Sequence, residues 1–267
     1  MNSGLQRRLE RAKADVQRVD SALMNRGEIL PTTLRRELQE NHLPKLSCIR
    51  HWEHLIVARE QAWNGLVGLE GRAQEGKVPF GEAMVAFHVV RFLMMQAYLS
   101  ATWSLADHLT GVCAKIVCPK CQTKDPRTPV QLVSGFLKRD KVDTPASLSE
   151  PLRLCFGWPI GISYALRNYF IHDGALNPED PLTFFREETP DSGFMLTEDG
   201  WMTIENIARK YSVRPEQHRA VWPSDPTADL RPVLAACEQD LDEALGLLLG
   251  TATKMMMAEV AILLDED

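Results

Sequence analysis

Arg167, Asn168 and His172 combine three side chains that suit chemistry on a phosphodiester. A guanidinium can bind two phosphate oxygens at once, an imidazole can transfer a proton near neutral pH, and an amide can orient either group. At about 100° per residue of α-helix, these side chains fall on one face together with Tyr164 and Ile171. This face is the candidate catalytic surface, with Tyr164 as a substrate-binding residue.

The opposite face of the same predicted helix is apolar and is expected to pack in the core. Pro159 suits the first helical position, and Gly174 can end the helix. The apolar residues are Ile162, Ala165, Leu166, Tyr169 and Phe170. The alternative interpretation is structural, because the helix dipole favours a histidine near a helix C-terminus and Arg167 can be an ordinary surface residue.

The order Arg-Asn, three residues, then His near a helix end resembles the Arg-x(4–6)-His signature of the HEPN superfamily (higher eukaryotes and prokaryotes nucleotide-binding). The resemblance rests on Arg167, Asn168 and His172, and Asp173-Gly174 is similar to the residues that come after the motif in many members. It is tied to the region 80–175. It implies an all-α fold, usually dimeric, and in many members a metal-independent endoribonuclease of toxin–antitoxin, abortive-infection or CRISPR systems.

This resemblance implies RNA cleavage by 2′-hydroxyl transesterification, with no cofactor for catalysis. His172 would act as general base or acid, Arg167 would stabilise charge on the phosphorane, and Asn168 would orient the histidine or a phosphate oxygen. The protein would be a toxin or phage-defence effector with an antitoxin or defence-complex partner. The alternative is a non-catalytic binding or assembly module, such as an antitoxin or a scaffold subunit.

A homodimer with one composite site is expected, because transesterification needs a base and an acid on opposite sides of the phosphate and one helix offers one His. A two-fold axis beside the motif helix would also bury Ile171 and Tyr164. The alternative is that Ile171 packs under a neighbouring helix of the same chain.

A second polar line lies in the region from Phe80 to Val117, which contains no proline and is expected to form one or two long helices. Ser104, Asp107 and His108 recur there at helical spacing. In HEPN-like folds such a helix packs beside the motif helix, so these three residues are candidates for substrate binding. The alternative is a solvent-facing line.

Cys118-Pro-Lys-Cys121 has the spacing of half a zinc site, since the tight turn points two thiolates at one tetrahedral ion. Cys113 and His108 are the nearest candidates for a further ligand, and two chains could pool their cysteine pairs. These residues are candidates for a structural zinc that takes no part in catalysis. The alternative is a pair of reduced thiols in a basic loop.

The composition of the 267-residue chain, 45% hydrophobic and 25% charged, is that of a soluble globular protein. Six cysteines do not suggest a disulfide scaffold, and the first residues lack an apolar signal-peptide core, so a cytoplasmic location is expected. The net charge of −6 argues against a general nucleic-acid coat, but basic residues between 115 and 141 leave room for a local basic site.

Helices are also predicted on the N-terminal side of this region. Before Gly27, apolar residues alternate steps of four and three, which indicates a short heptad stripe: Leu5, Leu9, Ala12, Val16, Val19 and Leu23. The stripe either contacts a partner or packs on its own domain, and the second interpretation is preferred.

A second helix is expected to begin at Thr32 or Thr33 and to stop at Pro44. A third, marked by apolar residues from Trp52 to Leu66, is expected to end around the glycines between Gly65 and Gly76.

After the motif, residues 183–186 and 194–197 are expected to form a small β-hairpin or two short extended pieces. Residues 198–200 are expected to form a turn, and Thr203 to cap a helix over Ile204–Tyr211.

A last helix is predicted from about Val233 to Leu264. Its apolar end is interrupted by Lys254 and Glu259, so burial or an oligomer contact is expected rather than a membrane span. The predicted architecture is all-α: an N-terminal helical appendage at 1–48 and a HEPN-like helical bundle at 49–267, with the small hairpin after the motif helix.

Overall fold

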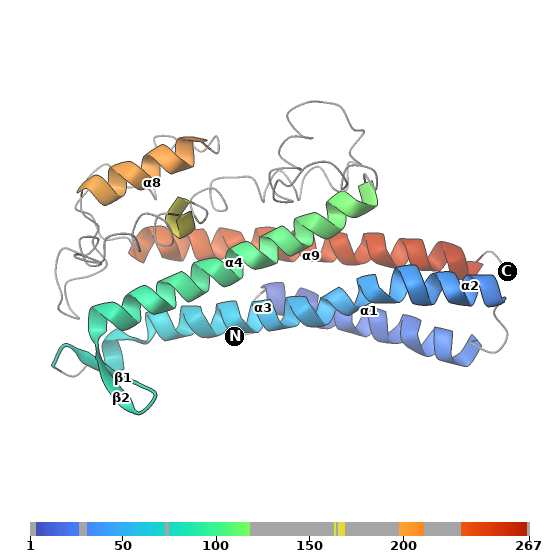
Figure 1. The fold of residues 1–267 in the computed structure, drawn as a ribbon, viewed down its shortest axis with the longest axis horizontal. Helices are drawn as coiled ribbons and strands as arrows, with labels where there is room; N and C mark the ends of the chain where they lie inside the picture. Colours follow the sequence, from blue (N-terminus) through green and yellow to red (C-terminus); the bar gives the residue numbers. More distant parts are fainter. Residues whose placement is uncertain are drawn as a thin grey trace. The chain divides into compact units, whose positions relative to one another are not determined.

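The computed structural model describes residues 4–26, 31–72, 75–117, 163, 165–168, 198–210 and 231–265 (Figure 1). These residues are mostly helical, which confirms the all-α prediction at the level of fold class. The helices are α1 (Gly4–Arg26), α2 (Thr32–Glu37), α3 (Leu43–Val67), α4 (Phe87–Val117), α8 (Glu198–Lys210) and α9 (Arg231–Asp265). A π-helical turn (Leu38–His42), a 3-10 turn (Glu70–Arg72) and the strands β1 (Lys77–Phe80) and β2 (Ala83–Ala86) complete the described elements.

The chain divides into two compact units. Unit 1 consists of Met1–Ile56, Ser104–Cys155 and Asp242–Asp267, and unit 2 consists of Val57–Trp103 and Phe156–Leu241. The predicted boundary between an appendage at 1–48 and a bundle at 49–267 stays a prediction.

In unit 1, α1 packs along α9, as the preferred interpretation of its heptad stripe predicts. Its stripe residues Leu5 and Leu9 are fully buried, and the backbone N–H of Leu5 donates to the Asp242 carboxylate at 3.2 Å. Gly246 makes the close approach possible, since a Cβ there would lie 2.9 Å from the Cδ of Arg8. The helix ends at Arg26, directly before the predicted stop at Gly27.

The predicted stop at Pro44 is wrong, because the chain stays helical from Thr32 to Val67. Pro44 is the second residue of α3, and α3 directly follows the π-helical turn. A proline removes one N–H donor and crowds the carbonyl four residues earlier, so a change in hydrogen-bond pattern at this point lets the helix continue.

The predicted helix start at Phe80 is also wrong, because residues 77–86 form an antiparallel hairpin and α4 begins at Phe87 (Figure 1). Phe80 pairs with Ala83, which leaves Gly81 and Glu82 as a two-residue turn. Gly81 has a φ of 62°, as the first turn position of a type II′ hairpin requires. A small hydrophobic core forms between the hairpin and the chain segments next to it in the sequence. Its buried residues are Leu69, Val78, Phe87 and Val90.

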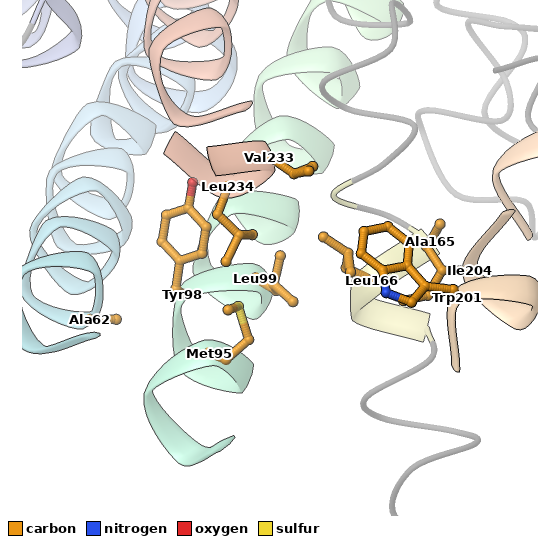
Figure 2. Packing of buried hydrophobic residues seen from close by; sticks show 10 residues of the cluster. All are labelled: Ala62, Met95, Tyr98, Leu99, Ala165, Leu166, Trp201, Ile204, Val233 and Leu234. Atoms are coloured by element: carbon orange, nitrogen blue, oxygen red, sulfur yellow. The ribbon is translucent and has the colours of Figure 1, made fainter. Parts of the chain in front are cut away.

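The main core of unit 2 joins short parts of several helices (Figure 2). Its buried residues are Ala62, Met95, Tyr98, Leu99, Ala165, Leu166, Trp201, Ile204, Val233 and Leu234. Trp201 of this core belongs to α8, which begins at Glu198. The predicted turn at 198–200 and the predicted cap at Thr203 are therefore wrong. Two acidic residues at positions 198 and 199 favour this earlier start, since carboxylates stabilise a helix N-terminus.

The last helix agrees with its prediction to within two residues at its start and one at its end. Among the helices that the structure describes, none is long and apolar enough to cross a membrane. The hairpin predicted at 183–197 lies outside the described residues.

Candidate functional site

The described part of the motif helix is held in the core of unit 2 by its apolar face. Residues 165–168 are helical, and Ala165 and Leu166 are fully buried, as the helical spacing predicts. Figure 2 shows both side chains beside Trp201 and Ile204 of α8. The contacts with α8 fix the rotation of this short segment, and therefore the direction in which its polar face points.

Arg167 and Asn168 follow directly and are half-buried. The Nη1 of Arg167 donates a hydrogen bond to the Oδ1 of Asn168 at 3.1 Å. The Nε of Arg167 is shielded from solvent and has no hydrogen-bond partner among the described residues. The amide thus orients a guanidinium that has further N–H donors for an anion. Tyr164 and His172 lie outside the described residues.

The second predicted polar line lies on α4 in unit 1. Ser104 and Asp107 are half-buried, and His108 is exposed. Arg167 belongs to unit 2, so the predicted common groove between the two lines stays a prediction. The Nε2 of His108 lies 3.1 Å from the Nε2 of His51 on α3, a residue that the sequence analysis did not single out.

The predicted zinc ligands Cys118 and Cys121 lie outside the described residues. Cys113 is on α4, but its side chain is not among those described. Within the described ranges, no three His, Cys, Asp or Glu residues gather closely enough to hold a metal ion. A structural zinc at the cysteines stays a prediction.

A buried polar network in unit 2 was not predicted. The Nε of Arg59 donates to the hydroxyl of Thr102 at 3.2 Å, and its Nη2 donates to the Glu238 carboxylate. The hydroxyl of Tyr98 donates to the same carboxylate oxygen. The side chain of Arg59 is 1% exposed and that of Glu238 is 19% exposed. Three helices, α3, α4 and α9, are therefore linked through one carboxylate.

One signal in the sequence could have indicated this network. Trp52, Ile56 and Ala62 form the buried stripe of α3, and Arg59 occupies a position of that stripe. A charged residue at a core position of a helix needs a buried partner. Which residue supplies that partner, 179 positions away, is not visible in the pattern.

Burial also governs the titration of the groups around the network. Burial raises the pKa of Tyr98 well above its usual value; the positive charge of Arg59 opposes this rise, and Glu238 adds to it. Burial likewise raises the pKa of the Cys237 thiol. At neutral pH this thiol is protonated and is a poor nucleophile.

An open cleft of about 460 Å³ in unit 1 is lined by residues of α1 and α3. Lys13 and Glu53 form an ion pair of 2.6 Å at its edge, and this hydrogen bond raises the pKa of Lys13. The cleft is lined by Lys13, Val16, Gln17, Asp20, Ser47, Ile49, Arg50 and Glu53, and contains none of the site residues predicted from the sequence.

No protein-family model, no curated protein and no solved structure matches this chain. Its function is therefore inferred from its own residues and their geometry. Of the predicted catalytic residues, Arg167 and Asn168 are the two whose positions can be described.

Proposed function

We propose that this protein is a metal-independent endoribonuclease that cleaves RNA by attack of a 2′-hydroxyl on the adjacent phosphate. It would act as a toxin or phage-defence effector. The observation that carries this proposal is the Arg167–Asn168 pair, a half-buried guanidinium held by an amide on a helical segment whose opposite face is fixed in the core. The HEPN-like order of Arg167, Asn168 and His172 supplies the third group.

The roles follow from what each group can do with a phosphodiester. Arg167 would bind a nonbridging phosphate oxygen and stabilise the charge that grows there as the phosphorane forms. His172, one helical turn after Asn168 in the sequence, would take the proton of the 2′-hydroxyl or give one to the leaving 5′-oxygen.

A second candidate function is a binding or assembly module without catalysis. The net charge of −6 favours it, because affinity for RNA depends strongly on neutralising phosphates with cationic side chains. In that case Arg167 would contact a protein partner or an uncleaved RNA.

The deciding experiment incubates the purified protein with end-labelled RNA in the presence of EDTA. Wild type is expected to cleave, and His172→Ala is expected to lose about 10²–10⁴-fold in rate, the usual contribution of a positioned proton-transfer group. Arg167→Ala is expected to lose cleavage as well, since the transition-state charge loses its main donor.

Two variants serve as matched controls. His54→Ala removes an exposed histidine of α3, and Arg18→Ala removes an arginine whose side chain is 78% exposed. Both are expected to cleave at the wild-type rate. RNA that binds but stays intact would favour the second candidate, and cleavage by His172→Ala at the wild-type rate would refute the catalytic assignment.

A further inference from the structure

His51 and His108 form a close pair of exposed histidines that the proposed ribonuclease reaction does not use as a pair. They come from α3 and α4, and both lie within unit 1. Their Nε2 atoms lie 3.1 Å apart, and their ring centroids lie 4.3 Å apart with an angle of 63° between the planes. The two Nε2 atoms are thus close enough for one ion to contact both.

This separation matches the span of two imidazoles across one metal ion. At a Zn–N distance of about 2.0–2.1 Å and a tetrahedral angle, two ligand nitrogens are about 3.3–3.4 Å apart. The observed 3.1 Å is reached with an N–metal–N angle of about 100°, a modest closure of that angle. The ring planes are inclined to each other and both side chains are exposed, so small rotations of the rings can direct both nitrogen lone pairs onto the ion.

We infer that His51 and His108 are two protein ligands of a site for a divalent transition metal ion of the zinc class. Neutral imidazole suits such ions, and water or an added ligand would fill the remaining tetrahedral positions. The two helix backbones hold the nitrogens in place before the ion arrives, which reduces the ordering needed on binding. The ion would fasten α3 to α4 within unit 1.

A direct hydrogen bond between the rings is the competing explanation for the distance, with one nitrogen as donor and the other as acceptor. The two explanations differ in one observable. A hydrogen-bonded pair has no need of a metal, whereas a bis-histidine site binds one ion and raises the unfolding temperature with its concentration.

The experiment uses the full chain, stripped with EDTA, dialysed and titrated with Zn²⁺ by calorimetry, with thermal unfolding measured in parallel. Wild type is expected to bind one Zn²⁺ ion per chain at this site. His51→Ala and His108→Ala should each bind that ion about 10²-fold more weakly or not at all, because one imidazole alone loses the advantage of two linked ligands. His54→Ala, which removes an exposed histidine three residues further along α3, is the matched control and should bind as wild type does. His51→Gln and His108→Gln repeat the test in case an alanine variant fails to fold.

Co²⁺ separates this site from any thiolate site without a cysteine substitution. Thiolate ligands give an intense near-ultraviolet charge-transfer band, while imidazole ligands give only weaker visible bands. The visible bands of wild type should decrease in the His51 and His108 variants and persist in His54→Ala. If the His51 and His108 variants bind Zn²⁺ with wild-type stoichiometry and affinity, or if wild type binds no ion that depends on them, the inference is wrong.

Discussion

Replacing Glu238 by alanine tests the buried network most directly. The change leaves the guanidinium of Arg59 without the carboxylate that its Nη2 contacts, at a side-chain exposure of 1%. It also removes the acceptor of the Tyr98 hydroxyl, in a residue that is 1% exposed. The hydrogen bond from Arg59 to Thr102 is retained, so the side chain keeps one of its partners.

The expected loss in free energy of unfolding is about 3–5 kcal/mol, the usual result of removing one partner of a buried ion pair. A buried hydroxyl without an acceptor accounts for about 1–3 kcal/mol of that loss, and the lost attraction between Arg59 and Glu238 for the rest. The 19% exposure of the Glu238 side chain places the expectation toward the lower end, since water can reach the vacated position. Against a typical total stability of about 5–15 kcal/mol, this is a large fraction.

The measurement is urea unfolding followed by circular dichroism, with the denaturant slope compared between variants to check that the same transition is observed. Glu40→Ala is the control, because the Arg36–Glu40 pair has side chains that are 76% and 59% exposed. Its loss is expected to stay below about 0.5 kcal/mol.

The double variant Arg59→Met/Glu238→Leu separates charge from packing. It replaces the ion pair with apolar side chains and should recover the part of the loss that comes from the charge of Arg59, whereas the part that comes from the Tyr98 hydroxyl remains. A single variant within about 1 kcal/mol of wild type, or a double variant no more stable than the single one, would refute the reasoning from a broken buried ion pair.

Three further predictions concern pH, assembly and metal. Burial raises the pKa of Tyr98 in the folded protein, so just above pH 10 only the unfolded chain releases the proton of this hydroxyl. The free energy of unfolding should therefore fall there by up to about 1.4 kcal/mol per pH unit. Urea unfolding measured at several pH values should show that Tyr98→Phe removes this contribution to the pH dependence. Ile171→Asp should shift the protein toward monomer in sedimentation and abolish RNA cleavage together, and a monomer that cleaves at the wild-type rate would exclude the composite dimeric site. Replacing both Cys118 and Cys121 by serine should lower the zinc content of the purified protein and its unfolding temperature, while cleavage by folded protein stays insensitive to EDTA; unchanged metal content would favour a pair of reduced thiols.

The amino-acid sequence by itself determined the features that depend on local periodicity. The long helix α9 and the buried side of Ala165 and Leu166 agree with the spacing of apolar residues, and α1 ends at Arg26, directly before the glycine that predicts its end. The positions of Arg167 and Asn168 beside that buried side follow from the same spacing, because a helix fixes the angle between consecutive side chains.

Tertiary structure decided the features in which a local preference competes with distant contacts. The strands of the hairpin at 77–86 are too short for periodicity to reveal, although Gly81 was a usable signal for the turn. Val78 of the hairpin packs against residues outside it, which local spacing does not show. Pro44 favours a helix end locally, yet the chain stays helical through it.

The same limit applies to side-chain partners. Arg59 contacts Glu238 across 179 positions, and His51 contacts His108 across 57. The spacing of residues within one helix predicts the face on which a side chain lies, but it does not predict which residue of another helix that side chain contacts. That pairing depends on how the helices pack, and only the folded chain determines it.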